Sequence, residues 1–210
     1  MGRVEGKVVL ITGGASGLGR ADALRLAEEG ASLVLTDINL TEGEKLSDEI
    51  GDSAIFLEQD VSDEKSWEIV IAKAVKEFGR LDALVNNAGI APISNIEQTS
   101  TEEWRRVMGV HLDATFFGCR AAIPEMARSG GGPIVNMSSI AALVGLSSYL
   151  SYSAAKGAIR SITKSIAMHC LEVENNIRCN SVHPGSISTP MVHNALEKLA
   201  GIKLMEQEDP

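Results

Sequence analysis

Two residues of the segment "YLSYSAAKGA" (149–158) have a spacing that could support proton transfer. Tyr152 is followed four residues later by Lys156, and residues four apart lie on one face of a helix. A free phenol has a pKa near ~10, and a nearby ammonium lowers it because it favours the phenolate. The pair could therefore accept the proton of an alcohol, although so short a pattern also occurs by chance on solvated helix faces. Tyr149 has only Ser153 at this spacing, and we interpret it as a pocket wall.

A glycine-rich stretch near the N-terminus has the pattern of a phosphate-binding turn. The segment "TGGASGLG" (12–19) follows an apolar run and precedes a helical pattern, with glycines at 13, 17 and 19. Glycine lets the backbone approach a pyrophosphate closely, and the N–H groups at the start of the following helix can bind it. The glycines could also serve turn geometry alone, but the position between strand and helix favours dinucleotide binding.

An acidic residue ends the second apolar run and bears on the choice of cofactor. Asp37 is placed where a carboxylate can accept hydrogen bonds from the adenosine ribose hydroxyls. The same charge would repel a 2′-phosphate, and Gly14 and Ile38 stand where a basic residue could bind that phosphate. A turn carboxylate without a ligand is the alternative. The sequence therefore predicts NAD rather than NADP.

These residues need a scaffold, and the order of apolar runs predicts one. Longer helix-like segments separate six short runs, many of them rich in β-branched residues, at 7–12, 32–37, 54–61, 81–87, 133–139 and 177–184. Three helix-like segments cover 16–30, 63–79 and 100–130, and the last opens with a capping-box pattern from Ser100 to Glu103. Alternating strands and helices predict a doubly wound parallel α/β sheet, the Rossmann fold, in one domain over residues 1–210.

Composition excludes several classes of protein. The chain has 210 residues, 44% of them apolar, and a net charge of -9, which disfavours nucleic acid as a partner. It has neither a basic block nor a membrane-length apolar run, and the N-terminus lacks a secretory signal, so we expect a cytoplasmic protein. The three cysteines, Cys119, Cys170 and Cys179, are expected to be reduced core thiols. The four scattered histidines do not suggest a metal site.

Taken together, the motifs resemble those of the short-chain dehydrogenase/reductase family along the whole chain. The glycine-rich turn, "DV" at 60–61, "NNAG" at 86–89, Ser139, Tyr152 with Lys156, and "HPG" at 183–185 occur in the family's order. The sequence of the segments "VLTDIN", "MSSIAALVG" and "NSVHPGSISTPMV" is most similar to that of members that oxidise hydroxysteroids and other secondary alcohols. The resemblance implies a homo-oligomer, a dimer or tetramer.

The resemblance also implies roles for matching residues. Tyr152 would be the general acid/base, with Lys156 lowering its pKa and Ser139 binding the substrate oxygen. Ser16 and Leu18 would border the pyrophosphate. The residues that would bind NAD are Gly13, Ser16, Gly17, Leu18, Gly19, Asp37, Ile38, Asp60, Val61, Asn87, Ala88, Gly89, Tyr152, Lys156, Pro184, Gly185, Ile187 and Thr189.

The sequence departs from the family pattern at two places. His111 stands where the family usually has an asparagine. In the family this asparagine is thought to hold a water that passes the proton from the lysine to solvent, which is called here the proton relay. Because the pKa of an imidazole lies near neutrality, His111 could replace that residue in the relay, or it could be a packed helix residue. The family also normally continues with another helix and strand after the segment that ends at Pro210, so we expect a form without its C-terminal strand.

The segments expected to face the substrate suggest its chemical class. "IAALVGL" (140–146) and "ISTPMVHNAL", within a substrate loop near 186–210, are apolar except for His193. They favour a hydrophobic or alicyclic alcohol over a charged sugar. Two alternatives remain: a 3-oxoacyl thioester reductase of fatty-acid synthesis, which Asp37 and the net charge disfavour, and a catalytically silent NAD-binding scaffold.

Overall fold

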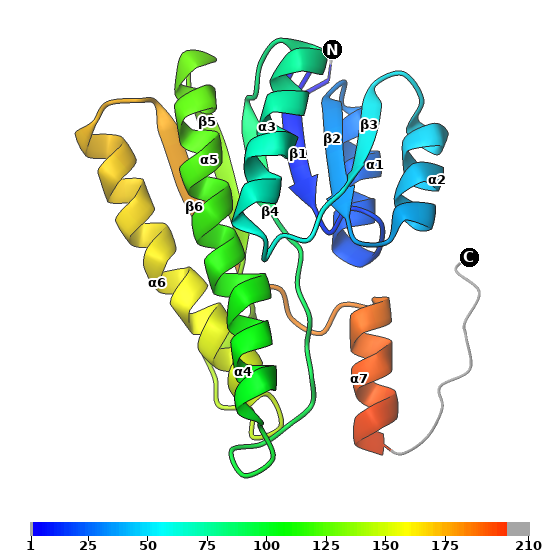
Figure 1. Ribbon diagram of the computed structural model, residues 1–210, viewed down its shortest axis with the longest axis vertical. Coiled ribbons are helices and arrows are strands. Elements are labelled where there is room, and N and C mark those ends of the chain that lie inside the picture. The colour runs from blue at the N-terminus through cyan, green and yellow to red at the C-terminus, as the bar shows by residue number, and fades with distance from the viewer. Residues whose placement is uncertain (1, 201–210) are drawn as a thin grey trace.

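A computed structural model describes residues 2–200 and shows one α/β domain (Figure 1). Six parallel strands form a single sheet in the order β3-β2-β1-β4-β5-β6. This order confirms the predicted doubly wound fold, and it places the reversal of strand order between β1 and β4. The strands are β1 (Val8–Thr12), β2 (Ser32–Asp37), β3 (Ala54–Glu58), β4 (Ala83–Asn86), β5 (Gly132–Met137) and β6 (Ile177–Val182).

Helices cover both faces of the sheet. One apolar cluster joins the sheet to α1 and α2 through Ala23 and Leu46, and the other joins it to α3, α5 and α6, with Trp67 and Met126 fully buried. Within residues 2–200, none of the helices combines the length and the apolar character that a membrane-spanning segment needs. The helices are α1 (Gly17–Glu28), α2 (Leu40–Ile50), α3 (Glu64–Phe78), α4 (Thr101–Met108), α5 (Ala114–Arg128), α6 (Leu150–Glu172) and α7 (Pro190–Ala200).

The long helical segment predicted at 100–130 is present but interrupted. A π-helical turn, Gly109–Asp113, joins α4 to α5, and such turns occur often at functional sites. The turn carries His111. The predicted substrate loop near 186–210 is partly helical, because α7 occupies Pro190–Ala200. Its residues 186–189 are not helical, and its residues 201–210 lie outside the described part of the chain. All three cysteines are free and buried, as expected.

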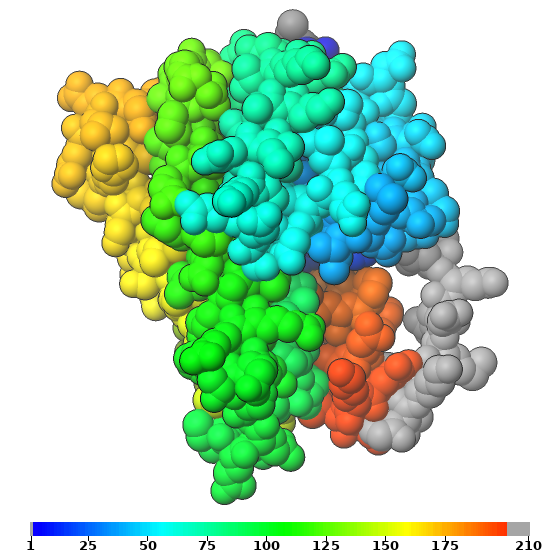
Figure 2. Space-filling view, in the orientation of Figure 1, coloured from blue at the N-terminus to red at the C-terminus, as the bar shows by residue number. Residues whose placement is uncertain are grey.

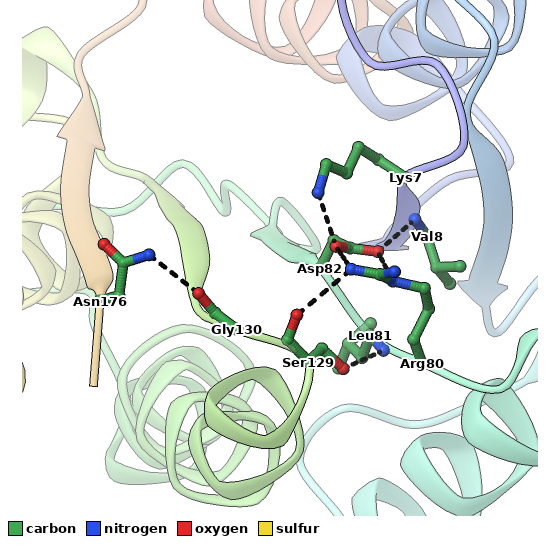
Figure 3. A network of polar contacts seen from close by, with 8 residues as sticks. All are labelled: Lys7, Val8, Arg80, Leu81, Asp82, Ser129, Gly130 and Asn176. Atoms are coloured by element: carbon green, nitrogen blue, oxygen red, sulfur yellow. Dashed lines mark hydrogen bonds and ion pairs between the residues drawn. The ribbon is translucent and has the colours of Figure 1, made fainter.

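The amino ends of the strands carry a network of polar contacts, and the carboxyl ends border a cleft. At the amino ends, Asp82 accepts hydrogen bonds from Arg80 (2.7 and 2.6 Å), Lys7 (3.0 Å) and the Val8 N–H (3.0 Å), as Figure 3 shows. Arg80 also donates to the Ser129 carbonyl at 3.2 Å. This network ties β1, β4 and the end of α5 together. At the carboxyl ends lies a cleft, beside which α7 packs (orange in Figure 2).

Candidate active site

A cleft of about 580 Å³ opens at the carboxyl ends of the strands. The structure brings most of the predicted site residues to its walls. They are Gly13, Ser16, Gly17, Leu18, Asp37, Ile38, Asp60, Val61, Asn87, Ala88, Gly89, Ser139, Tyr152, Lys156, Pro184, Gly185, Ile187 and Thr189. Gly19 and His111 are not on its walls and lie behind them.

The glycine-rich turn is held close to the end of β4. Gly13 has a φ of +64°, and a Cβ there would lie 2.7 Å from the Cα of Ala88. Asn87 Nδ2 donates to the carbonyls of Thr12 (2.9 Å) and Gly13 (3.0 Å). A Cβ at Gly19 would lie 2.1 Å from the Gly13 carbonyl oxygen. Position 19 therefore requires glycine even though it does not line the cleft. The turn therefore leaves the N-terminus of α1 facing the cleft, where it suits an anion.

The α1 N-terminus retains binding capacity, and so does Asp37. Ser16 caps the helix without using its side chain, so its hydroxyl remains available to a ligand. Asp37 Oδ2 accepts from the Ala15 N–H at 3.1 Å and Oδ1 from the Asn39 N–H at 3.0 Å. Each carboxylate oxygen has a second lone pair. The cleft, the glycine-rich turn, the available Ser16 hydroxyl and the remaining lone pairs of Asp37 together fit a dinucleotide.

Ser139, Tyr152 and Lys156 meet where β5 ends against α6. Ser139 Oγ accepts from the Ala141 N–H at 3.1 Å, which leaves its proton for another acceptor. The neighbouring Ser138 is different, because its hydroxyl donates to the Lys156 carbonyl at 2.9 Å. The structure therefore gives the two adjacent serines different roles. Ser138 binds the backbone of α6, and Ser139 faces Tyr152.

The ionisation of Tyr152 differs from our expectation. Burial raises its pKa above the ordinary 10.0, the Ser139 hydroxyl lowers it in part, and Tyr149 raises it further. The expected lowering by Lys156 is wrong for this arrangement, because the lysine is turned toward the strand. Its Nζ donates to the Met137 carbonyl at 2.6 Å and lies 5.5 Å from the centre of the Tyr152 ring.

Lys156 itself is strongly affected by its surroundings. It is 4% exposed, and burial lowers the pKa of its ammonium from 10.5 to about 7. Loss of hydration disfavours the charged form, and in the described residues no carboxylate pairs with this ammonium to offset that loss. A buried lysine with a pKa near neutrality beside a phenol is a typical feature of a functional site.

His111 is packed behind Tyr152, with the two ring centres 5.5 Å apart in an edge arrangement. Its Nε2 lies 2.7 Å from the Ile90 carbonyl and 3.0 Å from the Ile90 N–H, and its Nδ1 has no partner among the described residues. Burial and the charge of Lys156 lower its pKa to about 3, against a smaller raising effect of Ile90. The premise of a near-neutral pKa is therefore wrong, and His111 is a neutral imidazole at physiological pH.

Some lining residues had no signal in the sequence. Arg105, Arg106, Gly109 and Val110 reach the cleft from α4 and the π-helical turn, and only the path of this helix reveals them. Conversely, Tyr149 and residues 140–146, expected as substrate-facing, are not among the residues that line the cleft. Ile140, Leu143 and Val144 are instead exposed to solvent.

A parallel sheet in this strand order, with a glycine-rich turn after its first strand, defines a dinucleotide-binding Rossmann fold. The short chain dehydrogenase family model matches residues 7–200, and the chain belongs to this family. It is therefore an oxidoreductase that acts on alcohols or ketones with a nicotinamide cofactor.

Relatives of this chain include enzymes of secondary alcohols. It is 45% identical to a cyclopentanol dehydrogenase of Comamonas testosteroni, over 94% of this chain and 79% of the relative. It is 43% identical to an NADP-dependent (R)-specific alcohol dehydrogenase of Lentilactobacillus kefiri, over 90% and 77%. The structure of a 3-ketoacyl-(acyl-carrier-protein) reductase from Brucella melitensis, complexed with NADH, superposes with a TM-score of 0.86 at 34% identity, over 90% and 79%. The expected resemblance to secondary-alcohol dehydrogenases is confirmed.

Proposed function

We propose that this protein transfers a hydride between NAD and a hydrophobic or alicyclic secondary alcohol, hydroxysteroids included. The observation that carries the proposal is the meeting of Ser139, Tyr152 and Lys156 on one wall of the cleft. Asp37 lines the same cleft and supports NAD, because its charge would oppose a 2′-phosphate. The likeness to a cyclopentanol dehydrogenase supports the substrate class.

In this mechanism the residues divide the proton transfer among them. When bound, the nicotinamide takes up or supplies the hydride. The Ser139 hydroxyl donates a hydrogen bond to the substrate oxygen and so holds that oxygen near the phenol of Tyr152. Because burial raises the pKa of Tyr152, the phenol keeps its proton at neutral pH and is ready to donate it to a ketone. For alcohol oxidation the phenol must first ionise, so we expect the oxidation rate to rise with pH.

The roles of Lys156 and His111 follow from their contacts. Lys156 would hold the nicotinamide ribose when the cofactor binds, and its ammonium, 5.5 Å from the Tyr152 ring, would favour the phenolate if it left the Met137 carbonyl. His111 stays neutral and buried. Its Nε2 is held by the Ile90 backbone and its Nδ1 has no partner within residues 2–200, so Nδ1 is the nitrogen that remains as a hydrogen-bond acceptor.

A second candidate is a 3-oxoacyl thioester reductase, favoured by the likeness to the Brucella melitensis protein. Steady-state rates with cyclic and linear secondary alcohols, their ketones and an acetoacetyl thioester, each with NAD(H) and NADP(H), would decide between the two. The proposal predicts the highest kcat/KM for an alicyclic alcohol with NAD, by at least about tenfold over NADP. Preference for the thioester, or for NADP, would contradict it.

A further inference from the structure

Glu103, in the first turn of α4, does not complete the helix cap that its sequence position suggests. Its N–H donates to Ser100 Oγ at 3.1 Å, which forms one half of a capping box. In a complete box the carboxylate would return to the N–H of Ser100. Instead, Glu103 Oε1 accepts hydrogen bonds from the hydroxyls of Ser94 and Ser151, the latter at 3.5 Å. The carboxylate therefore joins α4 to two segments outside its helix.

Both serines are inaccessible to water and need a partner in the protein. Ser94 is 6% exposed and Ser151 is fully buried. An unpaired buried hydroxyl costs about 1–3 kcal/mol. The Ser94 hydroxyl also lies 2.9 Å from Thr99 Oγ1, whereas Glu103 is the partner of the Ser151 hydroxyl within residues 2–200. One carboxylate oxygen contacts both serines, so a single side chain joins the loop after β4 to the first turn of α6.

The main chain extends this connection to the start of α6. The Ser94 N–H donates to the Ser148 carbonyl at 3.0 Å, and the Leu150 N–H donates to the Ser94 carbonyl at 3.3 Å. These bonds make an isolated parallel bridge between Ser94 and Tyr149. Tyr149 directly precedes α6, and Ser151 directly precedes Tyr152 in the chain.

We infer that Glu103 is a positioning residue, which orients Tyr152 by fixing the start of α6 through Ser94 and Ser151. The inference rests on the proposed role of Tyr152. A carboxylate beside the first turn of a helix is also favoured by the helix dipole. Proton transfer requires the phenol within hydrogen-bond reach of the substrate oxygen, and a displacement of about 1 Å can cost about a hundredfold in rate.

The test compares three single variants in steady-state kinetics. Glu103→Ala removes the acceptor, and we expect kcat to fall by about 10- to 100-fold while the Kd for reduced cofactor stays unchanged. Glu103→Gln keeps an acceptor oxygen and should restore most of kcat. Glu102→Ala is the matched control, because Glu102 is the exposed neighbour in the same turn, and kcat should stay within about twofold.

Hydrogen exchange gives a readout that does not depend on activity. The amides of Ser94 and Leu150 should lose protection in Glu103→Ala and keep it in Glu102→Ala. If Glu103→Ala does not fold, Ser151→Ala removes one of the two hydroxyls and should lower kcat without changing cofactor affinity. The inference is overturned if Glu103→Ala keeps kcat and amide protection, or if cofactor binding falls in parallel with kcat. An inactive wild-type protein would instead count against the proposed function.

Discussion

Two carboxylates line the cleft, and their contacts give them different tasks. Asp60 Oδ1 accepts from the Ser62 N–H at 2.9 Å and its hydroxyl at 2.6 Å, so it is partly engaged in shaping the turn before α3. Asp37 uses each of its two oxygens for a single backbone N–H. A ribose diol can therefore still bind Asp37 through the remaining lone pairs.

At this scale, the choice of cofactor should depend on the charge of one side chain. Replacement by Asp37→Asn keeps an acceptor oxygen and removes the charge, so repulsion of a 2′-phosphate disappears. We expect the ratio of kcat/KM for NAD over NADP to fall by about tenfold or more. Asp37→Ala should in addition weaken NAD itself. An unchanged ratio in both variants would remove Asp37 from the cofactor site.

At the scale of elements, the π-helical turn and the strand end of β4 fit together through one close contact. A Cβ at Gly89 would lie 2.5 Å from His111 Cε1. The extra residue of a π-helical turn changes the direction of the side chains that follow. The small residue after β4 and the ring on the helix therefore depend on each other, and the ring reaches Ile90 only because Gly89 leaves space.

This dependence predicts a coupling between two substitutions. Gly89→Ala should lower the free energy of unfolding by about 1–3 kcal/mol, because the methyl group overlaps the ring. In a His111→Ala background the same change should cost at least about 1 kcal/mol less. Urea unfolding of the four proteins in the cycle measures this coupling.

Gly157→Ala is the control for the added methyl group. Gly157 lies inside α6 with open space where a Cβ would be, so alanine should be neutral or stabilising by about 0.5–1 kcal/mol. Additive effects of Gly89→Ala and His111→Ala would show that the ring can move away at no cost.

At the scale of the whole molecule, one end of the sheet holds contacts that stabilise the fold, and the other end holds the candidate active site. The amino ends hold the buried Asp82 network (Figure 3), and the carboxyl ends hold the cleft. Burial alone would raise the pKa of Asp82, but hydrogen bonds from Arg80, Val8 and Lys7 outweigh it and lower the pKa below 3.8. The carboxylate therefore stabilises the fold above this pH, and the contribution is lost as pH falls through the lower, folded-state value.

Asp82→Asn should accordingly destabilise the protein near neutral pH by about 1–3 kcal/mol without affecting the cleft. The deficit should shrink in acid, as the wild-type carboxylate becomes protonated. Unfolding free energies at several pH values measure it. Glu49→Gln serves as the control, since its ion pair with Arg20 is half exposed and should contribute less than about 1 kcal/mol. If both variants lost the same free energy of unfolding, or if the loss in Asp82→Asn did not depend on pH, this explanation of the Asp82 network would be contradicted.

The strands could be predicted because the apolar pattern that defines them is local, whereas the predicted residues of the cleft came from the order of motifs that the chain shares with its family. β1 and β2 occur where their apolar runs indicate, and the glycine-rich turn lies between strand and helix. The position of Glu103 could not be predicted, because its partners are brought near only by tertiary folding. The ionisation of Tyr152 was misjudged for a related reason, since spacing along a helix does not show which carbonyl a flexible lysine contacts. The pKa of His111 depended on burial, which a sequence pattern does not measure.

The central claim is that Tyr152 carries the proton in alcohol oxidation, and one substitution tests it most directly. Tyr152→Phe keeps the ring packed against His111 and removes only the hydroxyl. The measurement is kcat for an alicyclic secondary alcohol with NAD, alongside the Kd for NADH from fluorescence titration. We predict that kcat falls to less than about a hundredth of the wild-type value while the Kd is unchanged. A variant that kept about a tenth or more of wild-type kcat would contradict the assignment.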